Sequence, residues 1–147
     1  MIKERKGVFI SSWIHPGETG ASWILLGMIK FLLSDNKDAE VLRNNFVFKI
    51  VPMLNIDGVI HGNYWTSLSG ADLNWWWKHN NPDLYPTIYH SKQFCKKFYL
   101  EWDIVLHVDL HGHSWKRDCF MYGNTPEASL FPFILSKLYS SFNFNYC

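Results

Sequence analysis

The stretch GVFISSWIHPGETGASW, residues 7–23, contains the change of pattern that decides the fold. Residues 7–14 are rich in β-branched and aromatic side chains, which is typical of a strand. Residues 19–33 follow helical spacing, and Thr19 or Ser22 is the expected N-cap. The polar turn HPGE lies between the two patterns, so the stretch predicts a strand that passes directly into a helix.

The same alternation continues outward along the chain. The expected elements are a helix over 38–44, a strand over 46–53, a mostly irregular segment over 55–85, a helix over 87–100, a strand over 103–110, a further strand over 119–122 and a helix over 126–139. This order predicts an α/β fold with helices on both faces of the sheet. Sites in such folds form beyond the carboxyl ends of strands, which directs attention to the loops after Ile14 and Leu110.

Composition limits the kinds of partner that we expect. The chain has 147 residues, a net charge of +1 and a pI of about 7.8, so charge indicates neither a nucleic acid nor a membrane as partner. Three cysteines without metal-type spacing predict free thiols in a reducing compartment. The longest apolar run, residues 23–33, contains a lysine and is too short to span a bilayer. We therefore expect a cytoplasmic protein.

Two short motifs carry residues that suit a zinc ion. HPGE places His15 and Glu18 three residues apart on a turn, and DLHGHS places His111 directly after a strand. Two imidazoles and one carboxylate form a ligand set of hydrolytic zinc sites. Taken alone, HPGE is more typical of a surface turn, and the histidines of DLHGHS, including His113, are more typical of a solvated loop.

Two further motifs lie between them. In GADLN, Asp72 could accept a hydrogen bond from the second ring nitrogen of a zinc-binding histidine, and Asn74 could bind a polar group of a substrate. An Asx turn also explains both residues without any function. NIDG, residues 55–58, is fully explained by turn formation.

The order of these motifs resembles the zinc carboxypeptidases, and in detail their cytosolic carboxypeptidase branch, the tubulin deglutamylase-like enzymes. The segments that carry the resemblance are HPGETGASW, FVFKIVPMLN, DGVIHGNY, DLNWWWK, PTIYHSK, DLHGHS and FMYGN. They extend from about residue 7 to residue 147.

The resemblance implies a three-layer α/β/α sandwich with a mixed, mostly parallel sheet, of which residues 1–147 form a partial catalytic domain, incomplete on its C-terminal side. It implies one Zn²⁺ held by His15, Glu18 and His111, with Asp72 orienting His15 and Asn74 binding the terminal carboxylate of a peptide. The implied reaction removes C-terminal residues, in this branch glutamates, from protein tails such as those of tubulin.

The chain departs from the family in its arginines. It has eight tryptophans but only Arg5, Arg43 and Arg117. The resemblance places the carboxylate-binding arginine at Trp75 and the oxyanion arginine at Trp65. The other tryptophans that stand where relatives carry arginine are Trp13, Trp76 and Trp115, with Trp102 as a further instance.

The resemblance also places the general-base glutamate beyond Cys147, so no catalytic residue is assigned within the sequence. We expect the chain to be a fragment that is inactive as it stands. Two alternatives are a non-catalytic zinc-binding or protein-binding pseudoenzyme and the product of a decayed gene copy or a misread codon, since one base separates the codons CGG and TGG. A zinc amidohydrolase on a similar scaffold is a fourth interpretation.

Overall fold

The computed structural model describes residues 5–79 and 81–147. These residues form two compact units that divide between Gly112 and His113, and each unit is described by itself. Asn80, the last residue of the stretch NWWWKHN, lies outside the described residues.

A parallel sheet forms the centre of the first unit. Its strands are β1 (Lys6–Ser12), β2 (Phe46–Val51) and β3 (Ile104–Leu110), in the order β2-β1-β3. Ser11 of β1 is in register with Val51 of β2 and with Asp109 of β3. All three strands therefore end at the same edge of the sheet, where the predicted zinc ligands follow β1 and β3.

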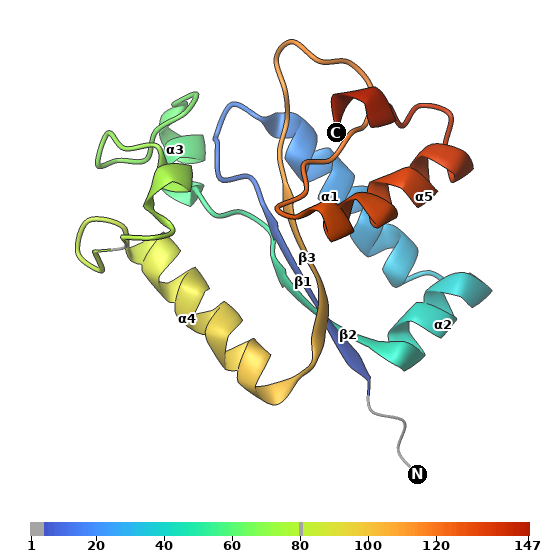
Figure 1. The fold of residues 1–147 in the computed structure, drawn as a ribbon. Helices are drawn as coiled ribbons and strands as arrows, with labels where there is room; N and C mark the ends of the chain where they lie inside the picture. Colours follow the sequence, from blue (N-terminus) through green and yellow to red (C-terminus); the bar gives the residue numbers. More distant parts are fainter. Residues whose placement is uncertain (1–4, 80) are drawn as a thin grey trace. The chain divides into compact units, whose positions relative to one another are not determined.

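The connections place helices on both faces of this sheet. Helices α1 (Thr19–Leu32) and α2 (Lys37–Asn45) join β1 to β2, and α3 (Ile56–His61), a 3₁₀ turn η1 (Leu73–Trp76) and α4 (Pro86–Glu101) join β2 to β3. The second connection runs back across β1. Because parallel crossovers are right-handed, connections in opposite directions lie on opposite faces. Figure 1 shows α1 and α2 on one side of the sheet and α4 on the other, as the predicted α/β/α fold requires.

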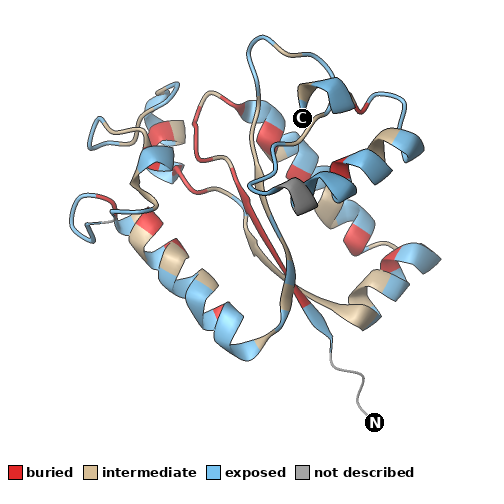
Figure 2. Ribbon diagram, viewed as in Figure 1, coloured by how far each residue is buried: buried red, intermediate tan, exposed pale blue. Residues whose placement is uncertain are grey.

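The two faces of β1 supply the core of this unit. Val8 and Ile10 pack against Leu25 of α1, whereas Phe9 faces α4, with its ring centroid 6.5 Å from that of Phe98. This alternation follows from the two-residue period of a strand. Figure 2 shows β1 as a largely buried central strand, so β1 is the element on which both helical layers pack.

Several predicted boundaries were wrong, each for a local reason. Neither Thr19 nor Ser22 caps α1: Glu18 holds the N-cap position without a side-chain cap bond, and the Ser22 hydroxyl donates to the Thr19 carbonyl. Strand β2 ends at Val51, because Pro52 has no N–H for the ladder. The segment 55–85, predicted to be mostly irregular, is mostly irregular as described, but it contains the unpredicted helix α3, capped by the Asn55 side chain.

The regular elements described in the second unit are one α-helix and two 3₁₀ turns. They are η2 (Pro126–Ser129), α5 (Leu130–Leu138) and η3 (Phe144–Tyr146), so the helix predicted over 126–139 begins as a 3₁₀ turn. The strand predicted over 119–122 is wrong apart from a single bridge between Cys119 and Phe142.

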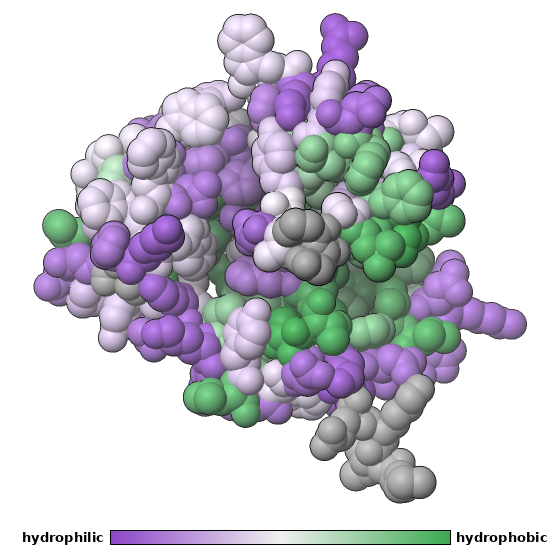
Figure 3. All heavy atoms as spheres, viewed as in Figure 1, coloured by the Kyte–Doolittle hydropathy of each residue, from purple (hydrophilic) through white to green (hydrophobic). Residues whose placement is uncertain are grey.

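Apolar surface remains accessible at the described edge of the sheet. Among the strands that the structure describes, β2 and β3 each pair on one side only, and Val105 of β3 is 53% exposed. Figure 3 shows apolar residues at the surface on the face where β3 lies. Open strand edges with apolar side chains favour association. Within residues 5–79 and 81–147, no helix combines the length and apolar character needed to cross a membrane.

The packing of α4 on β1 makes a prediction about stability. Phe98 is 1% exposed, whereas Leu100 on the same helix is 89% exposed. Phe98→Ala should lower the free energy of unfolding by about 3–5 kcal/mol, because it leaves a cavity beside Phe9. Leu100→Ala should change it by less than about 0.5 kcal/mol. Urea unfolding of both variants tests this; similar losses would contradict the assigned packing.

Candidate metal centre

The HPGE turn brings two predicted ligands together. Strand β1 ends where Trp13 adopts a left-handed backbone with φ of 59°, a conformation that costs a non-glycine residue about 1–3 kcal/mol. The Glu18 N–H then donates to the His15 carbonyl at 3.1 Å, which closes a tight turn. As a result, Nδ1 of His15 lies 3.0 Å from Oε1 of Glu18, and both side chains are buried.

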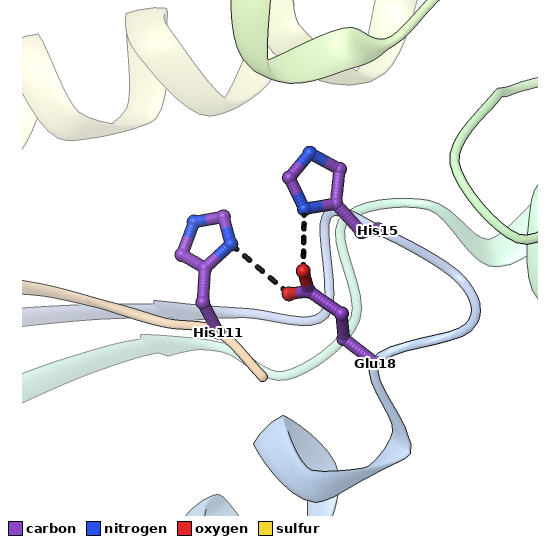
Figure 4. A group of neighbouring side chains, drawn as sticks. All are labelled: His15, Glu18 and His111. Carbon is purple, nitrogen blue, oxygen red and sulfur yellow. Dashed lines mark hydrogen bonds and ion pairs between the residues drawn. The ribbon is translucent and has the colours of Figure 1, made fainter. Parts of the chain in front are cut away.

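The third predicted ligand joins them from the end of β3. Nδ1 of His111 lies 3.1 Å from Oε2 of Glu18, and the Gly112 N–H donates to the same oxygen at 2.8 Å. Figure 4 shows both imidazoles directed at the one carboxylate. One ligand atom from each of His15, Glu18 and His111 lies within 4.8 Å of the others. The structure therefore brings together the three residues predicted to bind zinc.

The NIDG motif supports this turn, a role that the sequence interpretation missed. The Asn55 side chain donates to the Ile14 carbonyl at 3.0 Å and accepts from the Gly58 N–H at 3.1 Å. Asn55 is only 2% exposed. A Cβ on Gly58 would lie 2.4 Å from Cγ of Pro16, so this position requires glycine. The motif follows β2 after residues 52–54, at the carboxyl edge of the sheet, and that placement was the available signal.

The residues of GADLN lie on the far side of His15. Oδ1 of Asp72 is 3.1 Å from Nε2 of His15, where the predicted orienting residue should be, and it also accepts from the Asn74 N–H at 2.9 Å. The Asn74 side chain accepts from Nε1 of Trp77 at 3.2 Å. The Asx turn and a contact with the metal centre thus coexist at Asp72. Substrate binding by Asn74 stays a prediction.

His113 takes no part in the cluster. It belongs to the second unit, where its Nδ1 accepts from the backbone N–H groups of Trp115 and Lys116 at 3.2 and 3.0 Å. The group of possible ligands among the described residues therefore includes His111 but not His113.

Electrostatics favour an ionised carboxylate between the two rings. Burial by itself raises the pKa of Glu18, but hydrogen bonds from His111, His15 and the Gly112 N–H outweigh it and lower the pKa to about 2. Burial likewise lowers the pKa of His111, but hydrogen bonds to Asp109 and Glu18 raise it to about 10. Glu18 is therefore ionised without a metal ion, and a cation that binds there must displace the proton from His111.

Tryptophan, not arginine, lies beside the cluster in the first unit. The Trp65 ring meets His15 edge to face, with centroids 4.7 Å apart, and Trp75 is 81% exposed. The two arginines of this unit are engaged elsewhere: Arg5 stacks over Trp102, and Arg43 donates to the Leu32 carbonyl. Neither supplies a positive charge to the site.

Comparison with known proteins gives one consistent family. The family model described as zinc carboxypeptidase matches residues 1–129. The chain is 44% identical over 142 residues to cytosolic carboxypeptidase 2 of Xenopus tropicalis, covering 91% of this chain and 15% of that protein. It is 50% identical over 123 residues to cytosolic carboxypeptidase 1 of Homo sapiens, covering 83% of this chain and 10% of that protein.

Solved structures agree with these relatives. A metallo-carboxypeptidase from Burkholderia cenocepacia superposes with a TM-score of 0.78 at 26% identity, covering 95% of this chain and 40% of that one. A metallo-carboxypeptidase from Pseudomonas aeruginosa gives a TM-score of 0.76 at 25% identity, covering 93% of this chain and 36% of that one. The described fold is thus a carboxypeptidase fold.

The chain belongs to the zinc carboxypeptidase family, in its cytosolic carboxypeptidase branch. It spans 10% to 15% of the length of the two curated relatives above. Its cluster of two imidazole nitrogens and one carboxylate matches the donor set of catalytic zinc sites, so His15, Glu18 and His111 fit the metal that the family name implies.

The two pKa shifts predict how the stability of the zinc-free chain depends on pH. The pKa of Glu18 falls on folding from 4.5 to about 2, so its contribution is present above pH 4.5 and is lost as pH falls towards 2. The pKa of His111 rises from 6.5 to about 10, so its contribution is present below pH 6.5 and is lost as pH rises through 10. Stability from this pair should therefore be greatest between pH 4.5 and 6.5.

Urea unfolding across pH checks this expectation. The parent chain should lose stability as pH rises from 6.5 to 10, whereas His111→Gln has no imidazole to titrate and should not lose it. The difference in unfolding free energy between parent and variant should therefore shrink over that range. A difference that stays constant over that range would show that His111 is not held as an imidazolium.

Proposed function

We propose that this chain supplies the zinc-binding part of a metallocarboxypeptidase. The observation that carries the proposal is the convergence of His15, Glu18 and His111, whose ligand atoms lie within 4.8 Å of one another at the carboxyl edge of the sheet. A hydrolytic zinc site needs three protein ligands and an open position. The exposed fraction of the His111 side chain, 31%, leaves one side of the cluster accessible.

The residues then have distinct tasks. His15 and His111 each present Nδ1 to the centre, and Glu18 would supply a carboxylate oxygen in place of the hydrogen bonds it now makes with the two imidazoles. A Zn²⁺ ion held there would polarise a scissile carbonyl and lower the pKa of a water molecule. Asp72 accepts from Nε2 of His15 and keeps the ring directed at the centre. We infer from the family resemblance that Asn74, two residues on, binds the terminal carboxylate of a peptide.

The substrate class follows from the branch. We propose peptide and protein C-terminal tails, glutamate tails in particular and tubulin among their bearers, with neither nucleic acid nor a membrane as partner. Net charge of +1 supports the second part. The relatives are named cytosolic carboxypeptidases, which supports action in the cytoplasm.

The tryptophans weaken this activity. Trp has one N–H donor and no charge, so it replaces neither an oxyanion donor nor a carboxylate-binding cation. Loss of an oxyanion donor costs about 2.7–4 kcal/mol, and loss of a charged hydrogen bond costs about 1.5–3 kcal/mol. Together they would lower activity by a factor on the order of 10³ or more. Trp65 and Trp75 therefore favour a second candidate, a zinc-binding protein without catalysis.

Zinc binding is the first test of the proposal. The parent chain should bind about one zinc ion, measured by metal analysis after dialysis against a zinc buffer. His111→Gln should abolish stoichiometric binding, because it removes one of three ligands. His113→Gln is the matched control and should bind as the parent does, since His113 lies outside the cluster. A parent chain without zinc, or equal binding by both variants, would refute the assignment.

Restoring arginine separates the two candidate functions. In the longest natural form of the protein, Trp65→Arg and Trp75→Arg together should raise glutamate release from a C-terminal polyglutamate peptide by on the order of 10³-fold. Trp23→Arg, at an exposed position on α1, is the control and should have no effect. An unchanged rate in the double variant would mean that these tryptophans are not the cause of weak activity.

A further inference from the structure

Asp109 contacts the one ligating histidine for which the sequence analysis found no partner. It lies on β3, two residues before His111, so the two-residue period of a strand directs both side chains to the same face. Oδ2 of Asp109 lies 2.9 Å from Nε2 of His111. The opposite ring nitrogen, Nδ1, faces Glu18. The His111 ring is therefore held between two carboxylates, one at the centre and one behind it.

Ser11 determines the direction of the Asp109 carboxylate. The Ser11 hydroxyl donates to Oδ1 of Asp109 at 2.7 Å, and the two residues are paired in register across β1 and β3. Ser11 is 1% exposed, so its hydroxyl is held inside the packed sheet. With Oδ1 occupied, Oδ2 is left to accept from His111.

The two histidines of the cluster are then held in the same way. His15 presents Nδ1 to Glu18 and Nε2 to Asp72, and His111 presents Nδ1 to Glu18 and Nε2 to Asp109. A carboxylate that accepts from the second ring nitrogen fixes the tautomer and raises the basicity of the nitrogen that binds metal.

We propose that Asp109 is a positioning residue for the metal centre, which orients His111 and is itself aimed by Ser11. The proposal rests on the proposed zinc site. In this arrangement the pairing of β1 with β3 fixes the orientation of the His111 ring, because Ser11 on β1 holds Asp109 on β3 and Asp109 holds His111.

The experiment compares four variants of the whole chain. Asp109→Ala removes both the charge and the acceptor, Asp109→Asn keeps the shape and one acceptor, and Ser11→Ala removes the aiming hydroxyl. Asp38→Asn, on the exposed first turn of α2, is the control. Zinc affinity is measured by competition with a chelator, the absorption spectrum of the Co²⁺-loaded chain reports ligand geometry, and urea unfolding reports stability without metal.

The expected results are graded. Asp109→Ala should weaken zinc binding by about 10–100-fold and shift the Co²⁺ spectrum; Asp109→Asn and Ser11→Ala should lie between it and the control. Zinc affinity within about twofold of the parent for Asp109→Ala, with only lower urea stability, would overturn the proposal by showing a purely structural role. Absence of zinc binding by the parent would instead refute the zinc site itself, so the two failures are distinguishable.

Discussion

A buried carboxylate is the constraint on which the rest of this structure depends. Glu18 is 9% exposed, and an ionised carboxylate at that depth is costly unless it is paired and hydrogen-bonded. Its partners come from two places in the chain: the turn after β1, which supplies His15, and the segment directly after β3, which supplies His111 and the Gly112 N–H. Because both must meet at one point, the β1–β3 pairing, the HPGE turn and the entry into α1 are determined together.

The topology explains why this point lies where it does. The connection from β1 to β2 and the connection from β2 to β3 run in opposite directions, so the carboxyl ends of β1 and β3 lie at the topological switch point of the sheet. Strand β1 both packs against the helices and contacts Asp109 beside the cluster. Its even residues Val8 and Ile10 anchor α1, and its odd residues run from Phe9 against α4 to Ser11 against Asp109. The core and the metal centre are thus built on the same strand.

The strands and the three zinc ligands were predictable from the sequence, whereas helix α3 and the role of Asp109 were not. The three strands were found because their β-branched and aromatic runs are strong local patterns. Helix α3 was missed because its motif NIDG has the composition of a turn. The three zinc ligands were predicted from the order of the motifs and from the family resemblance. Local patterns alone could not predict them, because His111 and Glu18 are 93 positions apart and meet only through the parallel pairing of β1 with β3. Asp109 was overlooked for the same reason: its partner Ser11 belongs to another strand.

The central claim is that one Zn²⁺ binds between two imidazoles and a carboxylate. Zinc K-edge X-ray absorption of the zinc-loaded chain tests it most directly, because it reports the elements and distances around the ion. The account predicts nitrogen and oxygen neighbours at about 2.0–2.2 Å, two of them imidazoles. A sulfur neighbour at about 2.3 Å would place the ion on a cysteine, and a shell of oxygens without imidazole would indicate a non-specific surface site. Either result would contradict the assignment to His15, Glu18 and His111.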